Sequence, residues 1–290
     1  METFLTTSPA TVPDIHQISS DALKSWSRCK RQFYYKHVKK LQWPSDIQHF
    51  SLGKDVHKLL DYQARGLDCT LLLDHAPANV RISWQKLMAH SVVNLPVVAN
   101  EWAFHVPVNL QPDTLEKSST AILTSEIPKG ETAAMQDHWT ELSGSPVAWL
   151  TGRVDRVARE GDHILVIDWK TGTGVPRNPD VDWQTRLYLY ALVEVAGSPS
   201  AADLGLITEG APLRPEQVSF LYVEVKADAH TPVRLVPLPY STAQHLATRQ
   251  VLQTILSQMA IEEDYALPDN QQCPDRFCAY RSICGIESGN

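Results

Sequence analysis

The sequence predicts a single α/β domain. Helical patterns fill most of the first hundred residues, two β-rich runs flank Gly161-Asp162, and a strongly amphipathic helix, further strands and a last helix follow. Helices followed by a sheet with packed helices are typical of this class. With 290 residues, of which 43% are hydrophobic, the chain is long enough to bury one large core.

The first half of the chain contains three predicted helices and a strand. Hydrophobic residues recur at helical spacing near residues 20–39, and the helix predicted there contains Cys29. A second helix is expected to start after Gly53, and a third to cover 80–93. Residues 101–108, EWAFHVPV, alternate between two faces as a strand does.

The second half begins with a polar stretch and then becomes regular. Residues 109–146 contain proline and glycine and show no strong period apart from a possible strand at TAILTSEI, so we expect an insertion there. After the β-rich runs, the pattern predicts a helix at 182–197, strands at 218–225 and 232–238, and a long helix at 242–262. Within residues 1–290 we therefore expect a helical part at 18–95, a sheet core at 97–240 and a C-terminal part at 241–290.

The two β-rich runs carry the strongest chemical signal. If Gly161-Asp162 is a two-residue hairpin turn, Asp155 lies opposite Asp168, and Lys170 projects to the same face. Two directly opposed carboxylates repel each other, which a structural sheet would avoid. A bound Mg²⁺ or Mn²⁺ would offset this repulsion, and the Lys170 ammonium could orient an attacking water. The simpler interpretation of DWK alone is a surface salt bridge.

The motifs GRVDRV, VIDWKTG and QTRLYLYA resemble those of the RecB-like branch of the PD-(D/E)XK nuclease superfamily. The resemblance implies a restriction-endonuclease-like core, in which a mixed central sheet is flanked by helices, and metal-dependent hydrolysis of phosphodiester bonds. It makes Asp155 and Asp168 metal ligands and catalytic residues together with Lys170. Gln184 and Tyr188 match the family's helix motif, which makes them further candidate catalytic residues, although they could simply pack on the core face of that helix.

Two further metal ligands follow from the same resemblance. GKDVHKLL is similar to an upstream helix of the family, which makes His57 a candidate ligand, and a main-chain carbonyl near Trp169 could contribute as well. Glu101, which opens EWAF, resembles the acidic residue on the strand before the hairpin. A histidine on a helix is otherwise more often an ordinary exposed or hydrogen-bonded side chain.

Three of the five cysteines, Cys273, Cys278 and Cys284, lie in the last eighteen residues. An odd number of cysteines with this clustering favours a metal or cluster site over disulfides. Some RecB-like nucleases bind a [4Fe-4S] cluster through one early and three late cysteines, and the resemblance makes Cys29 the early ligand. Four residues separate Cys273 from Cys278, whereas the family commonly has two. Structural Zn²⁺ is the alternative occupant, and Cys69 is expected to be a buried thiol.

The segment from 22 to 44 contains no acidic residue and mixes basic with aromatic side chains. Such a segment could follow a phosphate backbone and stack on exposed bases, or it could be a solvated helix with an aromatic core stripe. The residues expected to contact DNA are Lys24, Arg28, Lys30, Arg31, Tyr34 and Lys36. The formal net charge of −7 argues against indiscriminate nucleic-acid binding over the whole surface.

These observations predict a metal-dependent deoxyribonuclease, in particular an exonuclease that acts on single-stranded DNA ends in recombination or repair. A prespacer-processing nuclease of CRISPR adaptation would have the same residues, and a helicase or CRISPR-adaptation protein is a conceivable partner. The alternative from another class is a catalytically silent iron–sulfur subunit that binds DNA. No apolar run approaches the roughly 18 residues of a membrane span and no signal peptide is evident, so we expect a cytoplasmic protein without a membrane partner.

Overall fold

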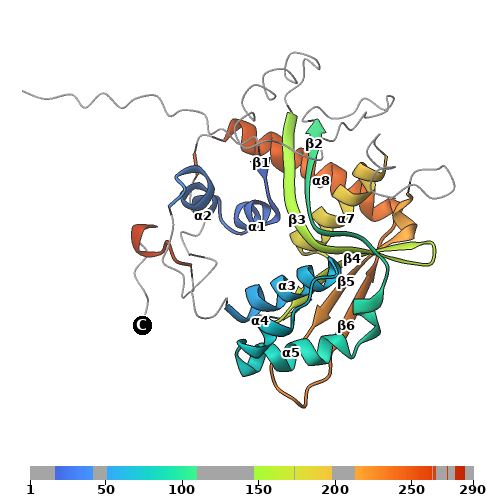
Figure 1. The fold of residues 1–290 in the computed structure, drawn as a ribbon. Coiled ribbons are helices and arrows are strands. Elements are labelled where there is room, and N and C mark those ends of the chain that lie inside the picture. The colour runs from blue at the N-terminus through green and yellow to red at the C-terminus, as the bar shows by residue number, and fades with distance from the viewer. Residues whose placement is uncertain are drawn as a thin grey trace, which may run out of the picture.

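A mixed six-stranded sheet with helices on both faces forms the centre of the protein, as a computed structural model shows (Figure 1). The structure describes residues 17–41, 51–109, 147–172, 174–197, 213–262, 264–265, 273 and 278–284. The predicted α/β class with a mixed sheet is confirmed. Apart from its first residue, the predicted insertion at 109–146 lies outside the described residues, and so does the possible strand within it.

The elements follow one another in nearly the predicted order. The helices are α1 (Ser20–Arg28), α2 (Lys30–Phe33), the π-helical turn η1 (Tyr34–Val38), α3 (Ser51–Ala64), α4 (Thr70–Asp74), α5 (Ala78–Met88), α7 (Trp183–Ala196) and α8 (Thr242–Ile261), with short 3₁₀ turns at Ser91–Asn94 (η3), Pro215–Gln217 (η5) and Ser282–Cys284 (η6). The strands are β1 (Gln17–Ile18), β2 (Val97–Asn109), β3 (Val147–Glu160), β4 (His163–Lys170), β5 (Val218–Glu224) and β6 (Arg234–Pro239). None of the described helices combines the length and the apolar character that crossing a membrane requires.

Strand β3 organises the sheet. It pairs antiparallel with β2 along most of its length. On its other side it pairs with β1 at Trp149 and Leu150, and with β4 only from Arg156 to Glu160. Between Leu150 and Arg156, β3 has no paired strand on that side within the described part of the sheet. Asp155 lies at the end of this gap, next to the last β3–β4 pair.

The predicted register of the hairpin is confirmed. Glu160 pairs with His163, and Arg156 pairs with Ile167, which is the register that a two-residue turn at Gly161-Asp162 requires. Gly161 has a φ of 59°, in the left-handed region that glycine adopts at no steric cost. The same register places Asp155 opposite Asp168, but the paired ladder stops one residue before them, so the two strands separate at the carboxylates.

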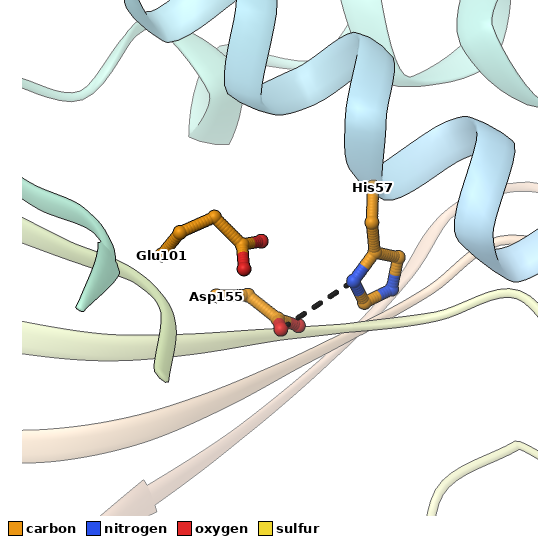
Figure 2. A group of neighbouring side chains, drawn as sticks. All are labelled: His57, Glu101 and Asp155. Atoms are coloured by element: carbon orange, nitrogen blue, oxygen red, sulfur yellow. Dashed lines mark ion pairs between the residues drawn. The ribbon is translucent and has the colours of Figure 1, made fainter. Parts of the chain in front are cut away.

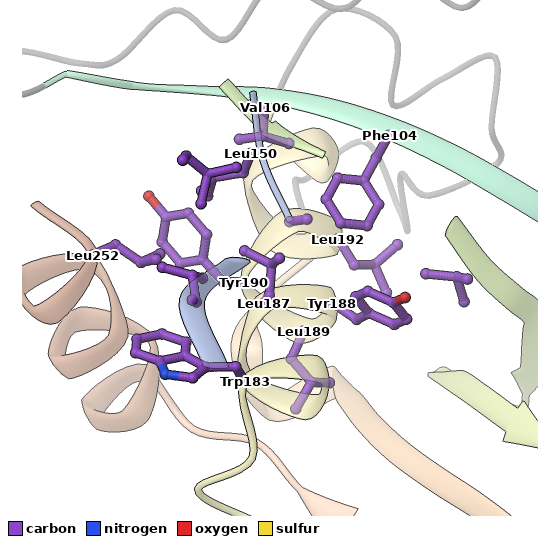
Figure 3. Close-up of a cluster of buried hydrophobic side chains, with 14 of the residues drawn as sticks. Phe104, Val106, Leu150, Trp183, Leu187, Tyr188, Leu189, Tyr190, Leu192 and Leu252 are labelled. Atoms are coloured by element: carbon purple, nitrogen blue, oxygen red, sulfur yellow. The ribbon is translucent and has the colours of Figure 1, made fainter. Parts of the chain in front are cut away.

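Two hydrophobic cores cover the two faces of the sheet. The larger core lies under α1, α7 and α8, where Leu187, Tyr190 and Leu252 are buried (Figure 3). The smaller core lies under α3 and α5 on the opposite face and includes Trp169. Side chains alternate along β4, so Asp168 belongs to the first face and Trp169 to the second. The sheet is therefore buried on both faces around the hairpin.

Two helix predictions were wrong in detail. The predicted helix at 20–39 is interrupted at Cys29, whose backbone is extended (φ −164°, ψ 116°), and a new helix starts at Lys30. The expected helix at 80–93 ends at Met88 because His90 leaves the helical conformation and its ring nitrogen caps the amide of Val92 instead. The short helix α4 was not predicted.

We expect Gly152→Ala to lower the free energy of unfolding by about 1–3 kcal/mol, because overpacking a buried site forces neighbours to move. A Cβ at Gly152 would lie 2.5 Å from a ring atom of Phe104 and 3.0 Å from one of Tyr188, and both rings are buried. Urea denaturation measures the change. Gly172→Ala is the matched control, since a Cβ there meets nothing within 4 Å, and equal losses in the two variants would contradict the packing argument.

Candidate active site

Three predicted metal ligands come together at the end of the β3–β4 hairpin ladder. His57 from α3, Glu101 from β2 and Asp155 from β3 each offer a ligand atom, and these atoms lie within 4.8 Å of one another (Figure 2). Among the described residues, no other group of three or more His, Cys, Asp or Glu side chains meets this distance. The three side chains are half-buried, so the group is reachable from solvent.

The backbone of Trp169 links this group to strand β4. Its amide donates to Asp155 Oδ2 at 2.9 Å, and its carbonyl oxygen lies 2.9 Å from His57 Nε2. His57 Nδ1 lies 3.4 Å from Asp155 Oδ1. Because β3 and β4 separate here, the Trp169 amide is free to bind the carboxylate. The main-chain carbonyl that the sequence indicated as a possible ligand thus faces the same group.

Asp168 does not belong to the three-residue group. Its Oδ1 accepts a hydrogen bond from Gln184 Nε2 at 2.6 Å, and its Oδ2 lies 2.7 Å from Lys170 Nζ. Lys170 in turn donates to Gln184 Oε1 at 3.0 Å. Burial raises the pKa of Asp168 to about 6, with a further rise from Asp155 and opposing effects of Lys170 and His57. The Gln184 amide therefore holds the acid and the lysine of the DWK motif in one fixed arrangement.

Tyr188 lies one helical turn after Gln184 on α7, and the two side chains are hydrogen-bonded. Burial raises the pKa of Tyr188 to about 12, and the charges of Asp168 and Asp155 add to this rise. The phenol is therefore neutral at physiological pH. Its ring also packs edge-on against Phe104 at a centroid distance of 5.6 Å, so Tyr188 joins the site to the larger core.

His57 carries a proton in the metal-free protein at neutral pH. Burial alone would lower its pKa, but the hydrogen bond and charge of Asp155, the Trp169 carbonyl and the charge of Asp168 raise the pKa to about 9. A metal ligand must be neutral at the coordinating nitrogen, so a metal at this site would displace that proton. The same acidic groups that stabilise the positive charge of the His57 ring would also stabilise a bound metal cation.

The residues present fit a hard divalent cation. Carboxylate oxygens, a backbone carbonyl and one imidazole are donors that suit Mg²⁺ and Mn²⁺ better than softer metals. Burial raises the pKa of Glu101 and the charge of Asp155 raises it further, while His57 and Arg153 lower it. The carboxylates therefore destabilise one another unless a positive charge lies between them.

The backbone of Glu101 is strained. Its φ is 49°, in the left-handed region that few residues other than glycine, asparagine and aspartate adopt. The neighbouring pairs are Asn100 with Arg156 and Trp102 with Val154, so Glu101 lies opposite Asp155 without a ladder pair of its own. Such strain costs about 1–3 kcal/mol and is concentrated at functional sites.

We expect Glu101→Asn to retain or raise thermal stability while it weakens Mn²⁺ binding at least about tenfold. Asparagine tolerates the left-handed conformation and removes the repulsion with Asp155, but it removes a carboxylate ligand. Differential scanning fluorimetry and calorimetric Mn²⁺ titration measure the two effects. A variant that loses stability and keeps full Mn²⁺ affinity would contradict this role of Glu101.

All six side chains predicted to contact DNA have partners within the chain. Lys24 lies 2.9 Å from Asp182, and Lys36 lies 2.7 Å from Asp21. Contacts with the C-terminal part are made by Lys30 to Glu262, by Arg31 Nε to the Tyr265 carbonyl at 2.8 Å, and by the Tyr34 ring stacked on Tyr265 at 4.8 Å. Arg28 is also engaged in interactions. These ion pairs reduce the positive charge that the sequence indicated.

The N-terminal helices and the C-terminal cysteine segment lie side by side. Tyr280 donates to the Leu41 carbonyl at 2.8 Å, and Tyr35 donates to the Ile283 carbonyl at 3.5 Å. Burial raises the pKa of the Cys284 thiol, Arg31 lowers it, and the charges of Cys29 and Cys273 raise it again.

The predicted cluster ligands Cys29, Cys273, Cys278 and Cys284 all belong to the described residues, yet no three of their sulfurs lie within 4.8 Å of one another there. The structure therefore brings the early and late cysteines into one region without forming a closed four-cysteine site. Cys69 is buried elsewhere, in the smaller core, as expected.

Comparison with known proteins identifies the class of this site. A family model of the PD-(D/E)XK nuclease superfamily matches residues 17–285. The chain belongs to the PD-(D/E)XK nuclease superfamily, whose members hydrolyse phosphodiester bonds.

More specific comparisons are distant. The solved structure of SSO0001 is 13% identical, with a TM-score of 0.37 over 96% of this chain and 90% of that one. A structure from Eubacterium rectale titled "Putative exonuclease" is 8% identical, with a TM-score of 0.42 over 85% of this chain and 82% of the other. A search of curated proteins gives no significant match.

Proposed function

We propose that the protein is a Mg²⁺- or Mn²⁺-dependent deoxyribonuclease that acts as an exonuclease on single-stranded DNA ends in recombination or repair. The observation that carries the proposal is the convergence of His57, Glu101 and Asp155 beside the Asp168–Lys170–Gln184 arrangement. An acidic metal site next to an ordered lysine is the combination that water-mediated phosphodiester hydrolysis needs. We also propose that the protein is located in the cytoplasm.

In this proposal the metal ligands are His57, Glu101, Asp155 and Asp168, together with the Trp169 carbonyl. The bound Mg²⁺ or Mn²⁺ supplies Lewis-acid polarisation of the scissile phosphate and stabilises the leaving oxygen. Asp168 would complete the ligand set from the neighbouring position on β4, where its Oδ2 lies 2.7 Å from Lys170 Nζ.

Lys170 orients the attacking water and stabilises the charge that develops on the phosphate. Its ammonium is held by Gln184 at 3.0 Å and lies over the Tyr222 ring at 5.4 Å, so its position is fixed before substrate binds. Gln184 Oε1 would keep this hold on the lysine if Asp168 coordinated the ion. Tyr188, hydrogen-bonded to Gln184, fixes the orientation of the amide and offers a neutral donor near the DNA backbone. Preorganised donors of this kind lower the barrier most where water is excluded.

The proposed cluster site comprises Cys29, Cys273, Cys278 and Cys284, with a [4Fe-4S] cluster as its occupant. Four thiolates on one tetrahedral Zn²⁺, each about 2.3 Å from the ion, would be about 4 Å apart. In a [4Fe-4S] cluster each thiolate binds a different iron atom, so the sulfurs are spaced more widely. In addition to burial, the charges of Cys29 and Cys273 raise the pKa of the Cys284 thiol, and this proximity supports a shared site.

The cluster would have a structural role in this proposal. It would join the basic N-terminal helices to the C-terminal segment, which already contact each other through Lys30, Arg31 and Tyr280. The wall formed in this way would carry the basic and aromatic side chains that follow single-stranded DNA. The six proposed DNA contacts are Lys24, Arg28, Lys30, Arg31, Tyr34 and Lys36, several of which would exchange an internal acidic partner for phosphate.

An assay with matched linear and circular single-stranded DNA tests this function. In Mg²⁺ or Mn²⁺, the anaerobically purified protein should shorten the end-labelled linear strand progressively and leave the circle intact, and it should act more slowly on blunt duplex ends. Cleavage of the circle at the same rate would contradict exonuclease action. A preparation that binds DNA and cuts none of the three substrates would favour the alternative of a catalytically silent iron–sulfur subunit.

Processing of CRISPR prespacers would use the same residues, and a helicase or CRISPR-adaptation partner would place the enzyme in one pathway or the other. The two pathways differ in the expected substrate. A prespacer-processing enzyme should stop at a defined length when it trims a duplex with single-stranded overhangs, whereas a repair exonuclease should continue. The length distribution of the products on such a duplex distinguishes them.

A further inference from the structure

Arg156 is a fully buried arginine, with an exposed fraction of 0%, directly after Asp155 in β3. A buried guanidinium is expensive unless its donors are satisfied, and apolar residues of similar volume are often as stable or more so. Burial lowers the pKa of Arg156, and the charge of Asp61, which accepts a hydrogen bond from Asn100, raises it only in part. Stability alone therefore gives little reason for an arginine at this position.

The neutral acceptors of Arg156 lie on several elements. They are the carbonyls of Leu60 and Val93, each at 3.1 Å, and the side-chain oxygens of Asn100 at 3.3 Å and Gln63 at 3.4 Å. The guanidinium also lies 5.3 Å from the centre of the Trp169 ring. Arg156 thus contacts α3, η3, β2 and β4 from its own position in β3.

Most of these elements supply one part of the candidate metal site. Leu60 follows His57 by one turn of α3, and Asn100 immediately precedes Glu101 in β2. The Trp169 peptide bonds both Asp155 and His57. Together with Asn100, which donates to Asp61 of α3, Arg156 joins the three elements that carry the clustered ligands, where the strands of the hairpin separate.

We propose that Arg156 is a positioning residue that fixes the spacing of His57, Glu101 and Asp155 for the divalent ion, an inference that rests on the proposed metal-dependent function. Metal affinity depends on ligands held within fractions of an ångström, and groups that orient the ligands change it about 10- to 100-fold. Arg156 faces the smaller core, away from Asp168 and Lys170, and so it touches neither DNA nor the ion.

Calorimetric titration of the metal-free full-length protein with Mn²⁺ tests this proposal. Arg156→Met, which retains the volume and loses the hydrogen bonds, should weaken Mn²⁺ binding about 10- to 100-fold. Arg156→Lys, which keeps the charge and part of the bonding, should weaken it less. The rate of DNA cleavage at saturating Mn²⁺ should recover in both variants. The Mn²⁺ concentration that gives half the maximal rate should therefore change more than the maximal rate itself.

The matched control is Leu252→Ala, which removes a fully buried side chain from the larger core on the other face. It should lower the unfolding temperature and leave Mn²⁺ affinity unchanged. If the Arg156 variants also lose stability without a change in affinity, the role is only structural and the proposal is overturned. Should Arg156→Met not fold, Arg156→Lys and Asn100→Ala decide by the same criterion. A wild-type protein that binds no Mn²⁺ would overturn the metal-dependent function itself.

Discussion

Asp168→Asn is expected to lower the rate of DNA cleavage about a thousandfold or more. The substitution keeps the shape of the side chain and the hydrogen bond from Gln184, but it removes the charge from a proposed metal ligand next to Lys170. Loss of several kcal/mol of transition-state stabilisation corresponds to this factor. Single-turnover cleavage of labelled single-stranded DNA in Mn²⁺ measures it. Asp162→Asn, the same change on the exposed hairpin turn, is the matched control.

The same substitution should not destabilise the metal-free protein. Folding raises the pKa of Asp168 from 3.8 to about 6, chiefly because the group is buried. A carboxyl with a raised pKa binds more protons in the folded state, so its charge costs stability above pH 6, and this cost disappears as the pH falls below about 4. Asparagine removes the cost, although Lys170 loses its acidic partner and keeps Gln184 Oε1 as an acceptor. If the unfolding temperature of Asp168→Asn in EDTA were far below that of wild type, the lost activity would reflect misfolding.

Cys29→Ala is expected to remove the iron. Wild-type protein purified without oxygen should contain about four iron atoms per chain and absorb in the broad iron–sulfur band, and the variant should contain less than one. The unfolding temperature should fall because the proposed cluster would no longer join the N-terminal helices to the C-terminal segment. Elemental analysis and thermal melts measure both effects.

Cys69→Ala is the control for that prediction. Cys69 is buried in the smaller core, and its thiol lies near the carbonyls of Leu59 and Leu67, away from the other cysteines. Its loss should leave the iron content unchanged. Wild-type protein with one zinc and no iron would contradict the cluster, and an iron content unaffected by Cys29→Ala would contradict the ligand assignment.

Much of the fold could be predicted because it depends on local signals. The glycine in the hairpin turn determines the register, and the alternation of β4 then places Asp168 and Lys170 on one face. The hydrophobic run of α7 predicts a helix, but not its environment: we expected an amphipathic helix, whereas the consecutive residues from Leu187 to Leu192 are all buried, so α7 is covered on every side. These signals involve neighbours in sequence, so no tertiary information is required.

Other features depend on long-range contacts that the sequence does not contain. The helix break at Cys29 and the left-handed backbone at Glu101 have no local signature, since neither residue is glycine or proline. The internal partners of Lys24 and Lys30 come from Asp182 and Glu262, more than 150 residues away. The fold therefore determines how much of the positive charge of residues 22–44 is neutralised by distant acidic side chains.

The role of Arg156 was missed although the residue lies within the GRVDRV motif. A charged residue among the apolar positions of a strand that is otherwise buried is a signal that such a residue has specific partners. Its acceptors Leu60, Val93 and Asn100 lie on elements separated in sequence, so the signal indicates that partners exist but not which they are.

The most direct test of the metal-dependent nuclease is the Mn²⁺ dependence of cleavage measured with wild-type and Asp168→Asn protein purified side by side. The account predicts no cleavage by wild type in EDTA, a rate that rises to saturation as Mn²⁺ is added back, and no comparable cleavage by the variant at any Mn²⁺ concentration. Cleavage that persists in EDTA, or that is equal in the two preparations, would contradict it.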